Sequence, residues 1–289
     1  MTTADHFDVV IPAYNAQHSI QRAIRSAFEA GASNVIVVDD GSSDGTAELA
    51  RREGATVQSQ ANAGASIARR RGLALATSDF VVLLDADDAL VPAGVAHSLS
   101  LLEVDEQLAA VGGAALGESP ANLPVLIAPS GGRLSTEVLV AQGYSPVPPA
   151  CFVWRLEQVR RASGDMAPAP LRPRYAEDYE LLVRGAMLGG IVTHRRVTSL
   201  YSLSGGKSTI DPSRSIRASS EIRSHYAQHL GLNVPRWTER QVAARVSLRR
   251  SKDVSSHVSR LRLVVKASLL DPALIMPLVR SKLRRAGED

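Results

Sequence analysis

Three aspartates, Asp85, Asp87 and Asp88, lie within four positions directly after the apolar run Phe80–Leu84. This short run, rich in Val and Leu, predicts a strand buried on both faces. Unpaired charge is costly inside such a strand, so we expect the aspartates where the strand leaves the sheet, at the edge where α/β sheets bind ligands. Clustered carboxylates suit Mg²⁺ or Mn²⁺ shared with substrate phosphates, although a solvated acidic turn would have the same sequence.

A second acid pair, Asp39 and Asp40, ends the apolar run that begins at Asn34, and an arginine cluster, Arg69–Arg71, lies between the two acidic segments. Together they suit a ligand with a polar ring, a diphosphate and a metal, in which Asp39 or Asp40 accepts N–H bonds from a base. Adjacent helical residues point in different directions, so at most two of the arginines face a common site. The alternative for the cluster is a solvated helix face.

The loop after the first predicted strand adds polar groups at the same edge. Pro12, Ala13, Tyr14 and Asn15 connect that strand to an amphipathic helix, which places backbone N–H groups there. Neither a dinucleotide-binding GxGxxG segment nor a P-loop is present. Gly205–Ser208 resembles half a P-loop in composition but lacks its strand-to-helix context.

Strand and helix patterns alternate along the chain. Buried runs predict strands over 7–12, 34–40, 55–58, 80–84, 108–115, 150–154 and 191–203. Amphipathic spacing predicts helices over 20–28, 46–52, 66–76, 156–162 and 177–188, with another beginning at Pro92. This alternation predicts an α/β fold with a mostly parallel sheet flanked by helices.

Four segments in this order, Val10–Asn15, Val38–Thr46, Asn62–Gly72 and Leu84–Asp88, resemble the family-2 inverting glycosyltransferases with the GT-A fold. The resemblance extends more weakly to about residue 208 and implies a Rossmann-type, GT-A-like catalytic domain over 1–213. Within it, 1–115 would bind the nucleotide-sugar and 116–213 the acceptor, while 214–289 form a basic helical extension. The implied activity is that of a hexosyl- or N-acetylhexosaminyl-transferase with a UDP-sugar or related donor and a divalent metal, Mn²⁺ or Mg²⁺.

The resemblance also implies roles at the donor side. The loop from Pro12 to Asn15 would bind the nucleoside together with Asp40 or its neighbour Asp39. Arg69 occupies the family's arginine position and would approach the diphosphate.

Asp85-Ala86-Asp87 matches the family's DxD motif, with Asp87 as the metal ligand and Asp85 on the ribose or donor sugar. Glu177-Asp178 stands where the family places its general base, and we expect Asp178 to remove the proton of the acceptor hydroxyl. The alternative is that this acidic pair only complements the dipole at a helix N-terminus.

Two positions depart from the family pattern. Arg70 replaces the usual Asn, which leaves open which arginine faces the phosphates. Ser204 replaces a late His that can reach the metal in many relatives, so the metal would be held chiefly by Asp87 and the donor phosphates. Lys207, in the loop 204–209, is a further candidate for the phosphates, although loops of this composition are often only mobile surface.

Charge is distributed unevenly along the 289 residues. Residues 214–289 contain 16 Lys and Arg against 6 Asp and Glu, whereas the whole chain has 33 and 29. The basic tail suggests an anionic partner, such as a membrane surface that carries a lipid-linked acceptor. The alternative is that its helices pack on the catalytic domain or on a second subunit of a homodimer. Nucleic acid is not an expected partner.

A single cysteine, Cys151, is consistent with a reducing compartment. The first residues do not resemble a signal peptide, and no apolar run approaches the ~20 residues of a membrane-spanning helix. We therefore expect the chain in the cytoplasm or at the inner face of the cell membrane.

These patterns predict a metal-assisted, inverting glycosyltransferase that acts on a glycan or lipid-linked acceptor in cell-envelope polysaccharide or glycoconjugate synthesis. One alternative is a nucleotidyltransferase, which normally has a Gly-rich, basic first loop unlike Pro12–Asn15. The other is a catalytically silent nucleotide-sugar binding protein, consistent with Arg70 and Ser204.

Overall fold

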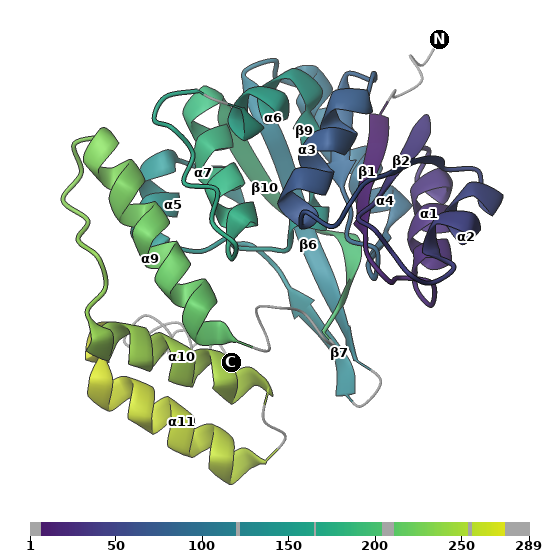
Figure 1. The fold of residues 1–289 in the computed structure, drawn as a ribbon. Helices are drawn as coiled ribbons and strands as arrows, with labels where there is room; N and C mark the ends of the chain where they lie inside the picture. The colour runs from purple at the N-terminus through teal and green to yellow at the C-terminus, as the bar shows by residue number, and fades with distance from the viewer. Residues whose placement is uncertain (1–6, 120–121, 165, 204–210, 254–255, 275–289) are drawn as a thin grey trace, which may run out of the picture. The chain divides into compact units, whose positions relative to one another are not determined.

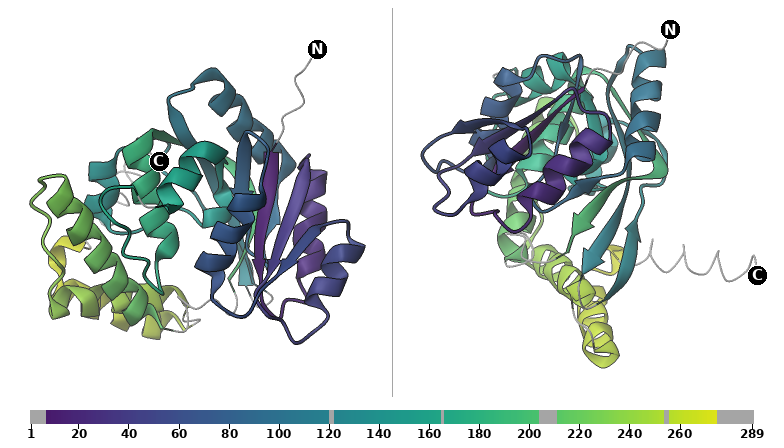
Figure 2. Two further views of the ribbon diagram at one scale, coloured as in Figure 1. Left: turned by 45° about the horizontal axis from the view of Figure 1, so that its top comes forward. Right: turned by 90° about the vertical axis from the view of Figure 1, so that its right-hand side faces the viewer.

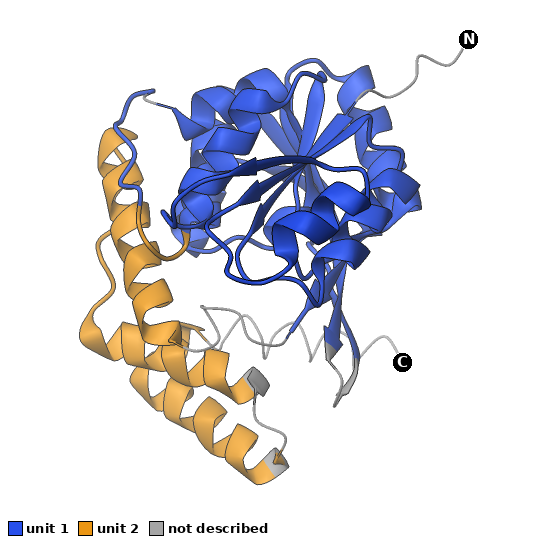
Figure 3. Cartoon of the chain, turned by 45° about the vertical axis from the view of Figure 1, so that its right-hand side comes forward, with its two compact units in different colours: residues 1–172, 177–204 blue, residues 173–176, 205–289 orange. Residues whose placement is uncertain are grey.

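The computed structural model describes residues 7–119, 122–164, 166–203, 211–253 and 256–274 (Figure 1). The chain divides into two compact units (Figure 3). Unit 1 comprises 1–172 with 177–204, and unit 2 comprises 173–176 with 205–289. Ser204 and Lys207, singled out in the sequence, lie outside the described residues.

Unit 1 is built on a mixed sheet. Its first part pairs in parallel in the order β3-β2-β1-β4, with bounds β1 Phe7–Ala13, β2 Asn34–Asp39, β3 Thr56–Ser59 and β4 Phe80–Leu83. The sheet continues through β9, β6, β10 and β5, with bounds β5 Ala89–Leu90, β6 Leu108–Ser119, β9 Phe152–Arg155 and β10 Gly190–Ser202. Two short strands extend it, β7 (Asn122–Ile127) on β6 and β8 (Gly132–Leu134) on β10.

Helices cover both faces of this sheet (Figures 1 and 2). Their bounds are α1 Ile20–Glu29, α2 Thr46–Arg52, α3 Ala65–Leu75, α4 Pro92–Val104, α5 Thr136–Gln142, α6 Leu156–Ser163 and α7 Glu177–Leu188. The apolar sides of α1 and α4 share a buried core with alternate residues of β1, β2 and β4, whereas α3, α6 and α7 lie against the other face.

One close contact fixes the rotation of α3. A Cβ added at Gly72 would lie 2.3 Å from Cγ1 of Val10, so only glycine lets the helix approach β1 this closely. Residues 69 and 72 are three apart and share a helix face. The side chain of Arg69 is therefore directed along the sheet surface and is only 12% exposed.

The predicted α/β architecture with flanking helices and a helical C-terminal region is confirmed. The parallel arrangement holds for β3-β2-β1-β4 and for β6 with β10, but β9 runs antiparallel to both β4 and β6. The strand predicted over 150–154 begins later, because Pro149–Cys151 form a 3₁₀ turn before β9. Proline has no N–H for a strand ladder, which favours this turn.

Unit 2 consists of α9 (Pro212–His229), α10 (Glu239–Asp253) and α11 (His257–Leu270). Trp237 stacks with two arginines, Arg223 at 4.7 Å and Arg245 at 4.1 Å from the ring centre. The guanidinium of Arg245 also pairs with Asp271 at 2.9 Å. In the described part of the chain, every helix falls short of the length and hydropathy needed to cross a bilayer.

Candidate active site

The acidic segment lies where β4 leaves the sheet. After Leu83 the backbone turns, and the N–H of Asp88 donates to the carbonyl of Asp85. Asp85 is half-buried, Asp87 is exposed and Asp88 is buried. Partial burial and the charge of Asp85 raise the pKa of Asp87, which means that a cation at this carboxylate would be favourable.

Asp88 connects the acidic segment to the end of β10. Its Oδ1 accepts a hydrogen bond from the N–H of Ser202 at 2.9 Å, while its Oδ2 is buried without a partner. Burial, followed by the charge of Asp85, raises the pKa of Asp88 to about 8. Asp88 therefore ties the end of β10 to the acidic segment.

Arg69 connects the acidic segment to α7. Its Nη2 donates to Oδ1 of Asp85 at 2.6 Å, and its Nη1 lies 3.3 Å from Oε1 of Glu177. Burial opposes the charge of Arg69, but Asp85 and Glu177 outweigh it and raise the pKa of the guanidinium. A diphosphate that approaches Arg69 would share it with both carboxylates.

Asp178 follows Glu177 in the first turn of α7. Burial and then the charge of Glu177 raise the pKa of Asp178 to about 6, although Arg69 opposes the shift. A carboxylate with a pKa near the working pH can both be ionised and accept a proton effectively. The structure thus brings Asp85, Arg69, Glu177 and Asp178 into one connected group.

The two acids that end β2 have different surroundings. Asp40 uses both carboxylate oxygens within the fold: Oδ1 accepts from Gln60 and from the N–H of Ala63, and Oδ2 accepts from the N–H of Gly64, all at 2.8 Å. Asp39 accepts a hydrogen bond from the N–H of Ser42 at 3.2 Å. Asp39 therefore has more capacity than Asp40 to accept an N–H bond from a base.

The first loop lies beside the loop after β2. Pro12 and Ala13 end β1, and the side-chain oxygen of Asn15 accepts from the N–H of Ser43 at 2.9 Å. Asn15 adopts a left-handed backbone with φ of 49°, and Tyr14 is 54% exposed. The exposed ring of Tyr14 is available to contact a ligand at this edge. Ala86, between the two acids of the DxD segment, is partly buried against the core.

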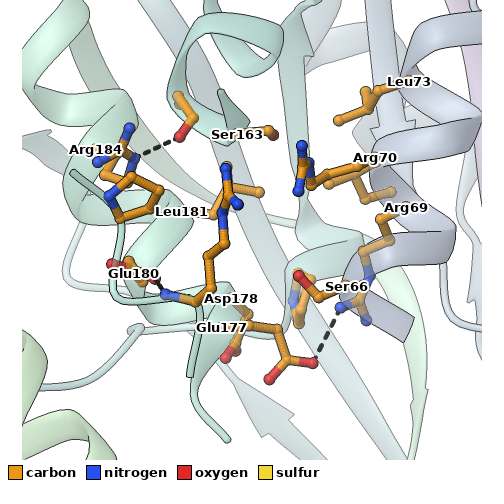
Figure 4. A pocket seen from close by; sticks show the side chains of 15 residues that line it. Ser66, Arg69, Arg70, Leu73, Ser163, Glu177, Asp178, Glu180, Leu181 and Arg184 are labelled. Atoms are coloured by element: carbon orange, nitrogen blue, oxygen red, sulfur yellow. Dashed lines mark hydrogen bonds and ion pairs between the residues drawn. The ribbon is translucent and has the colours of Figure 1, made fainter. Parts of the chain in front are cut away.

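A pocket lies between α3, α6 and α7 (Figure 4). Arg69 turns toward Glu177 in this view, while the neighbouring Arg70 extends into the pocket. The pocket wall includes Asp178 and two residues that the sequence analysis did not identify, Glu180 and Arg184. Their i,i+4 spacing in the sequence places them on one face of the helix, but the same spacing is equally typical of a surface ion pair.

Among the described residues, no three acidic, histidine or cysteine side chains are grouped to hold a metal ion. An exposed Asp87 beside Asp85 nevertheless suits Mg²⁺ or Mn²⁺, because such ions take much of their coordination from substrate phosphates and water.

Residues 8–122 match the family model described as glycosyl transferase family 2. This part of the chain is similar to glycosyl transferase family 2. Three curated relatives align over about a third of their lengths. They are the uncharacterized glycosyltransferase YibD of Escherichia coli (35% identity, 32% of this chain, 29% of the relative), the succinoglycan biosynthesis protein ExoU of Rhizobium meliloti (38%, 35%, 32%) and the amylovoran biosynthesis glycosyltransferase AmsB of Erwinia amylovora (40%, 34%, 36%).

Solved structures share the fold of this chain. TarS of S. aureus in complex with UDP-GlcNAc superposes with a TM-score of 0.55 at 16% identity, covering 91% of this chain and 79% of TarS. Glucosyl-3-phosphoglycerate synthase of Mycobacterium tuberculosis, crystallised with Mn²⁺, UDP and its product, has a TM-score of 0.51 at 20% identity, with 78% and 80% covered. At these identities the likeness establishes the fold alone.

Proposed function

We propose that the chain is an inverting glycosyltransferase that moves a sugar from a nucleotide-sugar donor to a hydroxyl of a glycan or lipid-linked acceptor. One observation carries the proposal: Arg69 links Asp85 of the DxD segment to Glu177, next to Asp178, so the residues that we assign to the donor and to the base belong to one group of side chains. The names of ExoU and AmsB support polysaccharide biosynthesis as the setting, and the UDP complexes of the fold relatives support a UDP-sugar as the first donor to test.

Inversion at the anomeric carbon needs one in-line displacement by the acceptor oxygen. Asp178 would remove the proton of that hydroxyl as the C–O bond forms, and the nucleoside diphosphate would leave from the opposite side. Arg69 would hold Asp85 in place through its hydrogen bond, and Asp39 would accept an N–H bond from the nucleotide base.

Asp87 would hold a divalent metal, Mn²⁺ or Mg²⁺, together with the donor phosphates. When bound, the metal would neutralise the charge that develops on the leaving diphosphate.

The test is incubation of the full chain with Mn²⁺ and a panel of UDP-, GDP- and dTDP-sugars, followed by analysis of the released nucleotide. A glycosyltransferase releases nucleoside diphosphate, slowly to water and faster with acceptor. With pyrophosphate added, release of nucleoside triphosphate and sugar 1-phosphate would support the nucleotidyltransferase instead, and binding without release would support a silent binding protein.

For unit 2, we propose contact with an anionic membrane surface on the cytoplasmic side. Along α11, four apolar side chains spaced by three and four residues share one helix face and are exposed by 48–73%: Val258, Leu261, Val265 and Leu269. Arg262 and Lys266 are exposed beside this stripe. An apolar stripe with basic neighbours is the pattern of helices that lie in the membrane interface.

A further inference from the structure

The last residue of β10 lies beside the acidic segment. Strand β5 follows that segment directly and pairs antiparallel with β10, with Leu200 opposite Ala89. In an antiparallel ladder, two steps forward along one strand match two steps back along the other. The register of β5 on β10 therefore places Ser202 opposite Asp87, the carboxylate that we assign to the metal.

Ser202 contacts the acidic segment through two different groups. Its backbone N–H donates to Oδ1 of Asp88 at 2.9 Å. Burial and the charge of Asp85 raise the pKa of Asp87, whereas a hydrogen bond with the side chain of Ser202 opposes that rise. A hydrogen bond that favours an ionised carboxylate is one that the hydroxyl donates and the carboxylate accepts. The hydroxyl of Ser202 is therefore a donor to Asp87.

The backbone that carries this hydroxyl is held on both sides. On one side Ser202 pairs with Glu118 of β6, and the carbonyl of Glu118 accepts from the N–H of Leu203 at 2.9 Å. On the other side the contact between β5 and β10 continues beyond β5, where the N–H of Val91 donates to the carbonyl of Thr198 at 2.8 Å. The end of β10 is thus fixed between two strands, and the hydroxyl of Ser202 has a defined position next to Asp87.

The exposed carboxylate of Asp87 needs such a support in order to bind a metal well. An exposed side chain has rotational freedom that it loses when it becomes a ligand. A residue that hydrogen-bonds a ligating carboxylate fixes the orientation of that carboxylate beforehand, and its loss typically weakens metal binding by about 10–100-fold. A hydroxyl has one hydrogen to donate, so Ser202 leaves Asp87 further lone pairs for a cation.

We propose that Ser202 is a positioning residue that orients the carboxylate of Asp87 toward a divalent metal, Mn²⁺ or Mg²⁺. The inference rests on the proposed function and adds to its metal site a residue that acts through Asp87. The contact with Asp87 comes from the side chain of Ser202, whereas the contact with Asp88 comes from the backbone. Substitution of Ser202 therefore removes the first contact and keeps the second.

The test is titration of Mn²⁺ into the full chain with UDP present, followed by the electron paramagnetic resonance signal of free Mn²⁺. We expect Ser202→Ala to bind Mn²⁺ at least about tenfold more weakly than the wild type. Ser202→Thr and Ser202→Val are a second pair, with the same shape but only one hydroxyl between them, so Thr should keep the wild-type affinity and Val should lose it. Thr193→Val is the matched control, because the hydroxyl of Thr193 belongs to the same strand but donates to the carbonyl of Gly132.

Calorimetric binding of UDP without metal separates positioning from a general structural effect. Ser202→Ala should bind UDP alone as the wild type does, because Ser202 acts only through the metal ligand. Weaker binding of UDP alone would overturn the positioning role, as would wild-type Mn²⁺ affinity in Ser202→Ala and Ser202→Val, or equal weakening in Thr193→Val. In each of these cases the proposed function would stand. A wild type that binds no Mn²⁺ with UDP present would instead refute the metal site of the proposed function, and the role of Ser202 with it.

Discussion

Replacing Asp178 by Asn should stabilise the protein while abolishing sugar transfer. The pKa of Asp178 is about 6 in the folded chain, against about 3.9 for an Asp in an unfolded chain. Between these values the folded state binds a proton that the unfolded state has released. The contribution of Asp178 to the free energy of unfolding therefore falls as pH rises from about 4 to about 6 and stays low above it.

The size of the effect follows from the shift. Two pKa units at about 1.4 kcal/mol each mean that ionised Asp178 lowers the free energy of unfolding by up to about 3 kcal/mol at pH 8. Asn has nearly the same shape and no charge, so Asp178→Asn should be more stable than wild type by up to this amount at pH 8 and by about zero at pH 4. For a unit of this size, each kcal/mol corresponds to about 2–4 °C in Tm. Loss of a general base should lower kcat by about 10²–10⁴-fold.

Urea unfolding of both proteins at pH 4, 6 and 8 measures the difference. Glu106→Gln is the control, because Glu106 is an exposed carboxylate outside this site. A variant that is less stable at pH 8, or a difference that does not change with pH, would refute the assignment of Asp178 as a half-buried base with a raised pKa.

Three further predictions concern other parts of the chain. Glu177→Gln should lower the pKa of Asp178, so the acid limb of kcat/KM, expected near pH 6 in the wild type, should move to lower pH; an unmoved limb would mean that another group titrates. Asp40→Ala should cost about 1–3 kcal/mol in urea unfolding, because partly buried N–H groups of Ala63 and Gly64 lose their acceptor, and an unchanged midpoint would contradict the anchoring role. The double variant Leu261→Asp, Leu269→Asp should no longer co-sediment with phosphatidylglycerol vesicles, whereas Val104→Asp, at another exposed apolar site, should still do so. The membrane proposal is wrong if the wild type does not sediment with the vesicles. It is also wrong if the wild type forms a dimer that the double variant dissociates.

Much of the fold was predictable because its signals are local. Apolar runs that end in acids predict strands that leave the sheet, and the acids after β2 and β4 do lie at such ends. The bounds of α2 and α7 agree with the prediction, since each begins at a polar residue and is followed closely by glycine, Gly54 after α2 and Gly189 after α7.

The division of roles between neighbouring residues was not predictable. Asp39 and Asp40 are adjacent, so a strand directs them to opposite faces, and only the path of the later loop 60–64 shows that Asp40 is used to hold it. Likewise, three consecutive arginines could not be told apart until Gly72 fixed the rotation of α3 against β1.

The pocket walls depended on longer-range structure still. Glu180 and Arg184 form no ion pair with each other in the described structure, despite their i,i+4 spacing, because each is directed to backbone groups of residues 162–172. That segment has no helix or strand pattern from which its path could be predicted.

The most direct test of the account is calorimetric binding of UDP in the presence and absence of Mn²⁺, with wild type and Asp87→Asn. We expect the wild type to bind UDP at least tenfold more tightly with Mn²⁺ than without it, and Asp87→Asn to lose that enhancement. If wild type binds no UDP or other nucleotide of the panel, or if Asp87→Asn responds to Mn²⁺ as the wild type does, the assignment of this acidic segment as a nucleotide-sugar and metal site is contradicted.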